Sequence, residues 1–128
     1  ENVERVRRIA DYFNERGELG PMELFDPLVT FTTRGDVGGP QTYSGHRGMH
    51  EALANFRQVW AEMEWHLVDF VERGDVVVAD FRFKIRSQGG VELETEEAWV
   101  YRFIRGKIAR IEQYGTRVKA LEAAGLRE

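Results

Sequence analysis

Residues 75–115, DVVVADFRFKIRSQGGVELETEEAWVYRFIRGKIARIEQYG, constrain the fold more than any other part of the chain. Their three apolar runs are separated by two turns that contain glycine, which predicts three consecutive antiparallel strands. In the first run every second residue is apolar: Val77, Ala79, Phe81, Phe83 and Ile85. The residues between them include Asp80, Arg82, Lys84 and Arg86. Alternation with a period of two is typical of a sheet that buries one face.

Charge sets the pairing of the first two strands. A three-residue turn at 88–90 places cations opposite glutamates in three successive outward pairs: Arg86 with Glu92, Lys84 with Glu94 and Arg82 with Glu96. Each exposed pair contributes roughly a few tenths of a kcal/mol. A shift of one residue would lose all three and turn every side chain to the other face, so we adopt this register.

The same register points one carboxylate into the apolar face. Glu97 falls opposite Phe81 and two residues before Trp99, on the side of the strand that is otherwise apolar. A second three-residue turn, at 104–106, would then place Gln113 opposite Glu97. The sequence therefore predicts that a carboxylate and an amide face each other on an aromatic and aliphatic surface.

Composition and charge exclude several classes of protein. A chain of 128 residues suffices for one core, so we expect a single domain over residues 1–128. The net charge of -4 leaves no basic surface for nucleic acid. No apolar run is long enough to span a membrane, and no signal-peptide pattern opens the chain. With no cysteine the fold depends on packing, which suits a cytoplasmic protein.

The rest of the chain predicts further elements. In order they are an amphipathic helix over 2–16, a short helix over 19–25 ended by Asp26-Pro27, a strand over 28–34, a loop over 35–40, a brief strand at 42–43, a helix over about 47–61, a strand over 65–72, and a helical tail after Tyr114 that stops at Gly125. The long helix has a core face at spacings of four, three and four: Met49, Leu53, Phe56 and Trp60.

This order of elements predicts an α+β fold. A curved mixed or antiparallel sheet would wrap around three N-terminal helices, and a short helical tail would follow at the C-terminus. A concave sheet roofed by helices leaves a cone-shaped cavity, which is a favourable place for a ligand.

Five segments carry a resemblance to a known family: GELGPMELF followed by LVTFTT, YSGHRGMHEAL at the entry to the long helix, ERGDVVVADFRF, and FIRGKIARIEQY at the last strand. In this order and spacing, over nearly the whole chain, the sequence resembles the SnoaL-like branch of the superfamily named after nuclear transport factor two. The resemblance implies the cone-shaped α+β fold of ketosteroid isomerase, polyketide cyclases and limonene epoxide hydrolase. It implies no single activity, because that fold supports many chemistries.

The catalytic residues of those relatives are absent here. At the matching positions this sequence has Thr33 for the isomerase's general-base aspartate, Ile9 near its oxyanion tyrosine, Trp99 for its hydrogen-bonding acid, Phe81 and Phe83 for the hydrolase's Arg-x-Asp pair, and Gln113 for the last-strand aspartate of the hydrolase and the cyclases. The resemblance therefore implies that any chemistry differs from theirs.

Glu97 is the leading catalytic candidate, with Gln113 as its partner. A carboxylate between Phe81 and Trp99 would lose hydration, which suits a general acid or base. Gln113 would orient that carboxylate or hold a substrate carbonyl. Two alternatives stay open: a β-bulge returns Glu97 to solvent, or an arginine at the sheet edge pairs with it.

Ligand-binding candidates share the expected cavity face. They are five aromatic residues that would surround a flat hydrophobic ligand, together with one hydroxyl: Trp60, Trp65, Phe81, Trp99, Tyr101 and Thr33. The alternative is that the aromatic residues simply form the core.

His66 and Asp69 also lie near the expected cavity. They are three residues apart on one strand, so they should face opposite ways. Which of them faces the cavity depends on whether the turn at Arg73-Gly74 has two or three residues, and the sequence leaves this open.

The sequence predicts no metal and no cofactor. His46 and His50 are four residues apart, but no third ligand stands near them. The glycines of residues 35–39 do not follow the strand–turn–helix pattern of nucleotide-binding loops.

An apolar strip should lie on the convex side of the sheet, because Val76, Val78, Ala98 and Val100 point outward by parity. An exposed apolar patch needs cover, and the resemblance implies dimers through this surface. We therefore expect a homodimer.

Two functions are compatible with these features. One is a pocket protein that binds a small hydrophobic molecule without catalysis. The other is an acid–base enzyme of the isomerase, cyclase or dehydratase type, acting on a small carbonyl or polyketide-like compound, in which Glu97 moves the proton and Gln113 holds the oxygen.

Overall fold

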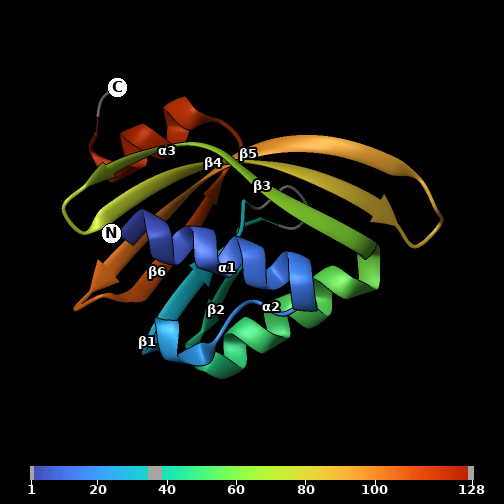
Figure 1. Ribbon diagram of the computed structural model, residues 1–128, viewed down its shortest axis with the longest axis horizontal. Coiled ribbons are helices and arrows are strands. Elements are labelled where there is room, and N and C mark those ends of the chain that lie inside the picture. The colour runs from blue at the N-terminus through green and yellow to red at the C-terminus, as the bar shows by residue number, and fades with distance from the viewer. Residues whose placement is uncertain (1, 35–38, 127–128) are drawn as a thin grey trace.

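The computed structural model describes residues 2–34 and 39–126 (Figure 1). Its elements are α1 (Asn2–Arg16), a 3-10 turn η1 (Met22–Leu24), β1 (Phe25–Thr32), β2 (Thr42–Ser44), α2 (Gly45–Val59), β3 (Trp60–Arg73), β4 (Val76–Ser87), β5 (Glu92–Ile104), β6 (Lys107–Tyr114) and α3 (Arg117–Ala124). The six strands form one sheet in the order β2-β1-β6-β5-β4-β3. Only β1 and β6 run parallel, so the sheet is mixed and the α+β prediction is confirmed.

Helices α1 and α2 cover the concave face of the sheet, and the main core lies between them and the strands (Figure 1). The predicted amphipathic helix over 2–16 is confirmed as α1, and its buried apolar residues are Val3, Val6, Ile9 and Ala10. Helix α2 ends at Val59, two residues earlier than expected, and Trp60 is the first residue of β3. Trp60 still packs partly against the core, but from a strand.

The predicted short helix over 19–25 is wrong in extent. Only Met22–Leu24 form a 3-10 turn, and Phe25 already begins β1. The Asp26-Pro27 pair lies within β1, where the Asp26 carboxylate accepts a hydrogen bond from the Leu28 backbone at 2.8 Å. Of the predicted loop over 35–40, residues 35–38 lie outside the described part of the chain.

The register between β4 and β5 is confirmed throughout. Arg86 pairs with Glu92 and Phe81 pairs with Glu97, as the alternation of charges predicted. The ion pairs themselves differ from that pairing. Arg86 binds Glu62 on the other neighbouring strand, and Arg82 approaches Glu94 diagonally at 4.0 Å. Exposed side chains of this length choose among neighbours of similar energy, so the strand register does not decide their partners.

The predicted register between β5 and β6 is wrong by two residues. The turn contains two residues, Arg105 and Gly106, with φ of 53° and 79°. Positive φ at both positions matches the right-handed twist of a tight hairpin. The extra residue Ala109 then forms a bulge. Gln113 therefore lies opposite Trp99 and not opposite Glu97. A shift of two residues preserves the face, so Gln113 still points toward the core.

A second bulge changes the outward side of β3. Leu67 pairs with Phe81 and Asp69 with Asp80, which leaves Val68 as the extra residue. His66 and Asp69 consequently face the same way, on the convex side, and the prediction that they face opposite ways is wrong. Neither lines the concave cavity, because Asp69 binds Arg117 of α3 and His66 binds the exposed Glu64.

The expected apolar strip exists, but the chain covers it with its own C-terminal helix. Val78, Ala98 and Val100 are buried beneath Ala120 and Leu121 of α3 (Figure 1). The prediction that this strip is exposed is therefore wrong, and it no longer calls for a second copy as cover.

Candidate functional site

A cavity of about 450 Å³ opens on the concave face, at the wide end of the cone. Its walls come from the ends of β1 and α2, from β3 to β5 and from β6. Six of the residues predicted for the site line it: Thr33, Trp60, Trp65, Glu97, Trp99 and Gln113. These residues are far apart in the sequence, and the curvature of the long strands brings them together.

Aromatic rings form the inner wall of the cavity. The ring centroids of Trp65 and Trp99 lie 5.2 Å apart at 70°, in an edge-to-face arrangement. Phe83 lies 5.5 Å from Trp99 and 5.6 Å from Trp65. Contacts of this kind hold flat side chains in fixed orientations. The wall is therefore rigid and presents flat apolar surface to a ligand.

Phe81 and Tyr101 were also predicted for the site, but both lie behind this wall in the core. Phe81 is fully buried and contacts Trp65 and Trp99 edge to face. Tyr101 lines a small void of about 10 Å³ between the helices and the sheet. Burial raises the pKa of the Tyr101 hydroxyl above its ordinary value, so it stays neutral. Neither residue lines the cavity of about 450 Å³.

Glu97 faces the cavity with two partners. Its Oε1 accepts a hydrogen bond from the Trp99 indole N–H at 2.8 Å, and its Oε2 lies 3.2 Å from Nη1 of Arg34. The side chains of Glu97 and Arg34 are 16% and 30% exposed. Both contacts stabilise the negative charge of a carboxylate. The predicted isolated acid among apolar neighbours is thus wrong in one respect, because an arginine pairs with it as the alternative reading held.

Gln113 places a primary amide at the cavity wall. The residue is 9% exposed, and its side chain lines the cavity. Within the described residues no hydrogen bond to its amide is found. A primary amide can donate two hydrogen bonds and accept two, so this side chain can bind a ligand oxygen or N–H.

Trp65 adds a second unpartnered donor at the same wall. Its ring is 4% exposed, and its indole N–H is buried without a hydrogen-bond partner among the described residues. The Trp99 indole differs, since its N–H is bound to Glu97. The two indole N–H groups therefore differ, because one has a partner and the other has none among the described residues.

Thr33 is mainly a structural residue. Its hydroxyl accepts a hydrogen bond from the Gln41 backbone N–H at 3.1 Å, and the Thr33 backbone donates to the Gln41 carbonyl at 2.9 Å. The hydroxyl keeps its own proton for a ligand, because a hydroxyl both accepts and donates.

The sequence reasoning missed nine residues of the cavity, including these four: Arg34, Gln41, Phe56 and Thr95. Two of these four carried a usable signal. Arg34 is the first charged residue after the apolar strand, and Thr95 shares the inward parity of Glu97. Gln41 follows the part of the chain that the structure does not describe, and nothing in the sequence marks it.

Within residues 2–34 and 39–126, no group of three or more potential metal-ligating side chains is found. No helix in the same residues is long and apolar enough to cross a membrane. His46 contacts the Phe25 carbonyl at 3.0 Å through Nε2, which gives it a role in holding α2 against β1.

Comparison of the structure with solved structures shows the same fold. TerC co-crystallised with polyporic acid is 25% identical, with a TM-score of 0.79 over 94% of this chain and 95% of that one. An NTF2-like protein of unknown function from Burkholderia pseudomallei is 21% identical, with a TM-score of 0.79 over 94% and 95% of the two chains. A ketosteroid isomerase-like protein from Catenulispora acidiphila, in complex with trimethylamine, is 16% identical, with a TM-score of 0.75 over 95% and 92%.

Comparison at the level of sequence gives the family. A search of curated proteins found no match. The family model of the SnoaL-like domain matches residues 6–111, which is most of the chain and includes every strand except the end of β6. Fold, order of elements and family model agree, and the chain belongs to the SnoaL-like domain family.

Proposed function

We propose that the protein binds a small, flat, hydrophobic molecule in the cone cavity, and that this molecule carries an oxygen that hydrogen-bonds to Gln113. The observation that carries the proposal is the Gln113 side chain, which lies at the cavity wall and forms no hydrogen bond with any described residue. Aromatic walls supply the affinity for a flat ring system, and one or two fixed polar groups orient it.

The likeness to TerC supports a ligand of this kind. TerC was co-crystallised with polyporic acid, and it shares 25% of its residues with this chain over almost the full length of both. A cavity of about 450 Å³ is also within the range that small organic ligands occupy in proteins.

Ligand binding in the cavity can be tested by a substitution on β5 that fills the cavity with a larger side chain. Thr95 lines the cavity, while its neighbour Glu96 points outward and is exposed. We expect 2-acetonaphthone, a flat bicyclic ketone, to quench tryptophan emission of the wild-type protein, because Trp60, Trp65 and Trp99 line the cavity. Thr95→Phe should weaken this binding at least about tenfold, since the new ring occupies the ligand volume.

Glu96→Phe is the matched control, because it adds the same ring to the other face of β5. It should leave the quenching unchanged. Equal affinities of the two variants for the ketone would contradict a ligand site in the cone.

A second candidate is acid–base catalysis by Glu97, favoured by the position of its carboxylate in the same cavity as Gln113. The carboxylate would remove a proton next to a ligand carbonyl, and the Gln113 amide would donate a hydrogen bond to the oxygen on which charge develops. Exchange of the methyl protons of 2-acetonaphthone in D2O, followed by NMR, tests this. Glu97→Gln should abolish the catalysed exchange and keep binding; no catalysed exchange by the wild-type protein would leave binding as the function.

The expected homodimer through the convex face remains a proposal. What now supports it is a pair of exposed valines, Val68 of β3 and Val118 of α3, at 46% and 66%. Sedimentation at micromolar concentration tests the homodimer, and a monomer mass would contradict it. A cytoplasmic location likewise remains a proposal, supported by the absence of cysteine from the chain.

A further inference from the structure

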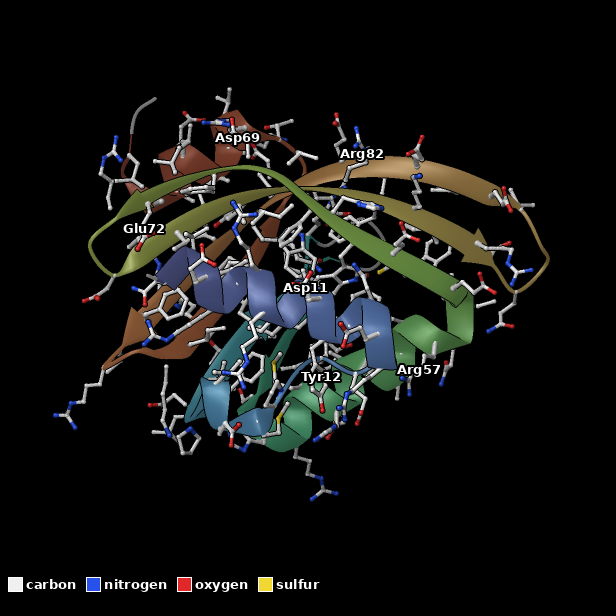
Figure 2. The ribbon with its side chains drawn as sticks, in the orientation of Figure 1. Asp11, Tyr12, Arg57, Asp69, Glu72 and Arg82 are labelled. Carbon is white, nitrogen blue, oxygen red and sulfur yellow. The ribbon has the colours of Figure 1, made fainter. Side chains whose placement is uncertain are left out.

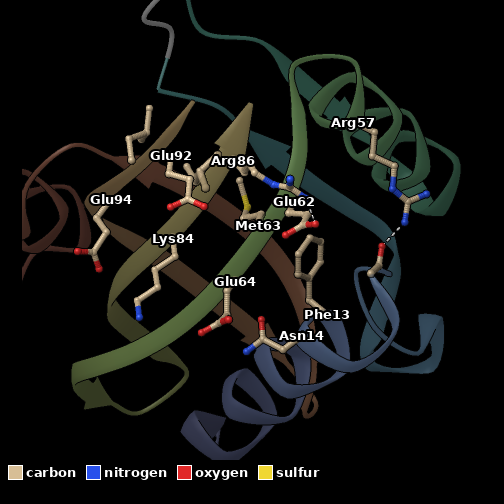
Figure 3. A pocket seen from close by; sticks show the side chains of 13 residues that line it. Phe13, Asn14, Arg57, Glu62, Met63, Glu64, Lys84, Arg86, Glu92 and Glu94 are labelled. Carbon is tan, nitrogen blue, oxygen red and sulfur yellow. Dashed lines mark hydrogen bonds and ion pairs between the residues drawn. The ribbon is translucent and has the colours of Figure 1, made fainter. Parts of the chain in front are cut away.

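A groove of about 820 Å³ lies next to the cone cavity, beside the edge of β3 (Figure 3). The groove lies between the end of α1 and the arm, by which we mean residues 60–66 of β3, 82–87 of β4 and 92–96 of β5. Three residues of the arm, Met63, Ile85 and Leu93, line both the cavity and the groove. The two spaces therefore adjoin each other across these three apolar side chains.

A contact between two helical segments lies at one end of the groove. Arg57, near the end of α2, donates a hydrogen bond to the carbonyl of Gly17, directly after α1 (Figure 3). Phe13 of α1 stacks on Trp65 with centroids 4.8 Å apart and forms the side of the groove that faces the cone. This end of the groove is therefore framed by the fold itself.

Four apolar side chains line the groove: Phe13, Met63, Ile85 and Leu93. Leu93 is 40% exposed although it also lines the cavity. The backbone N–H of Gln88 in the β4–β5 turn donates to the carbonyl of Val59 at 3.2 Å, which fixes the tip of the arm against the end of α2. An apolar lining of this kind next to a ligand cavity suits contact with an apolar group.

The rim of the groove carries both signs of charge, which decides the chemistry of that contact. Glu62 and Arg86 already neutralise each other, and Lys84 lies on the same strand between two acidic neighbours of β3 and β5, Glu64 and Glu94. Because neither sign dominates, the rim favours no ionic group. A neutral apolar chain on the floor is the best match.

We propose that the ligand of the cone carries an alkyl or similar apolar chain, which leaves the cone over Met63 and Ile85 and lies against Leu93. This rests on the proposed binding function and adds the class of ligand: a flat oxygenated ring with a hydrocarbon tail. The ring stays against the aromatic wall, while the tail occupies the groove.

The experiment measures affinity against chain length. 2-Naphthyl alkyl ketones from methyl to octyl keep the ring and carbonyl constant and extend only the tail. We expect the dissociation constant of the wild-type protein to fall about threefold for each methylene group that the groove buries. The slope should flatten when the tail reaches solvent beyond Leu93.

Leu93→Arg places a charge on the floor and should remove the dependence on chain length, whatever its effect on the methyl ketone. Val91→Arg is the control, because Val91 lines neither the cavity nor the groove and is 63% exposed. It should keep the wild-type slope. Circular dichroism of both variants confirms that they fold.

Each outcome is informative. If the methyl ketone binds but longer chains do not increase the affinity, the inference that the groove binds a tail is overturned, while the ligand site in the cone stands. If the Leu93→Arg variant keeps the dependence of the dissociation constant on chain length, the tail lies elsewhere, and this also overturns the inference. No binding by any member of the series overturns the inference together with the proposed function.

Discussion

Asn14 pairs with the backbone of one residue at the open edge of the sheet, in β3. Strand β3 has a neighbour on one side only, and an edge strand of fourteen residues exposes unpaired backbone groups that invite aggregation. The Asn14 amide donates to the Trp65 carbonyl and accepts from the Trp65 N–H, both at 2.8 Å. One side chain of α1 thus makes the two hydrogen bonds that another strand would make.

Asn14→Ala should lower the free energy of unfolding by about 1–2 kcal/mol, because both backbone groups of Trp65 lose their partner. Asn55→Ala is the matched control: Asn55 is also exposed on a helix, and it donates only to the Tyr43 hydroxyl. It should cost less than about 0.5 kcal/mol. Urea denaturation measures both, and equal costs would show that the edge contact contributes nothing of its own.

Glu97 illustrates what the sequence predicts at the scale of a residue. Its inward direction followed from the register of two neighbouring strands, and this direction is correct. Its partner did not follow, because Arg34 lies 63 residues away and reaches Glu97 only through the curvature of the sheet. The local pattern therefore predicted which face the acid is on, but not the charge beside it.

At the scale of elements, the charge pattern predicted the register of the β4–β5 hairpin correctly. The turn length assumed for the β5–β6 hairpin gave the wrong register. Strands β4 and β5 carry alternating cations and glutamates, and only one register pairs them. Strands β5 and β6 carry no comparable charge pattern. Their register depends on a two-residue turn and on a bulge at Ala109, and the bulge leaves no mark in the composition.

Helix α3 is held to the sheet by one ionic cluster in addition to its apolar face. Arg117 binds Asp69 of β3 at 2.7 Å and Asp80 of β4 at 2.6 Å. The bulge at Val68 is what turns both aspartates to the same face. Figure 2 shows Asp69 beside α3, on the side of the sheet away from Asp11 of α1.

The Arg117 hydrogen bond holds the pKa of Asp69 below its ordinary value of 3.8 in the folded protein. The unfolded chain therefore binds the proton more readily, so the contribution of this pair is complete above that ordinary value and is lost as the pH falls through the lower, folded value. Asp69→Asn should lower the urea midpoint at neutral pH, and its difference from the wild-type protein should shrink below about pH 4.

Asp11→Asn is the control for this measurement, since Asp11 is exposed on α1 and forms no ion pair with any described residue. Its midpoint should follow the wild-type protein at every pH. If the difference in urea midpoint between Asp69→Asn and the wild-type protein stays constant down to the acid transition, the ion pair with Arg117 does not stabilise the position of α3.

At the scale of the whole molecule, the fold converts an ordinary mixed sheet into a cone with a groove beside it. Helices α1 and α2 roof the concave face, α3 covers the convex one, and the long strands β3 to β5 extend beyond the helices on one side (Figure 1). The family fold was predictable from the order of segments, and the cavity followed from it. The groove was not predictable, because it depends on where α2 ends and on a side chain that joins the two helical segments.

The central claim is that the Gln113 amide hydrogen-bonds to an oxygen of the ligand. A thermodynamic cycle that changes both Gln113 and the ligand carbonyl tests it most directly. Calorimetry would compare 2-acetonaphthone with 2-ethylnaphthalene, which has the same shape without the carbonyl, on the wild-type protein and on Gln113→Leu. The substitution should reduce the ratio of the two affinities by about fivefold to tenfold, since it removes one hydrogen bond of roughly 1 kcal/mol or slightly more. A ratio that is the same in both proteins would contradict the account.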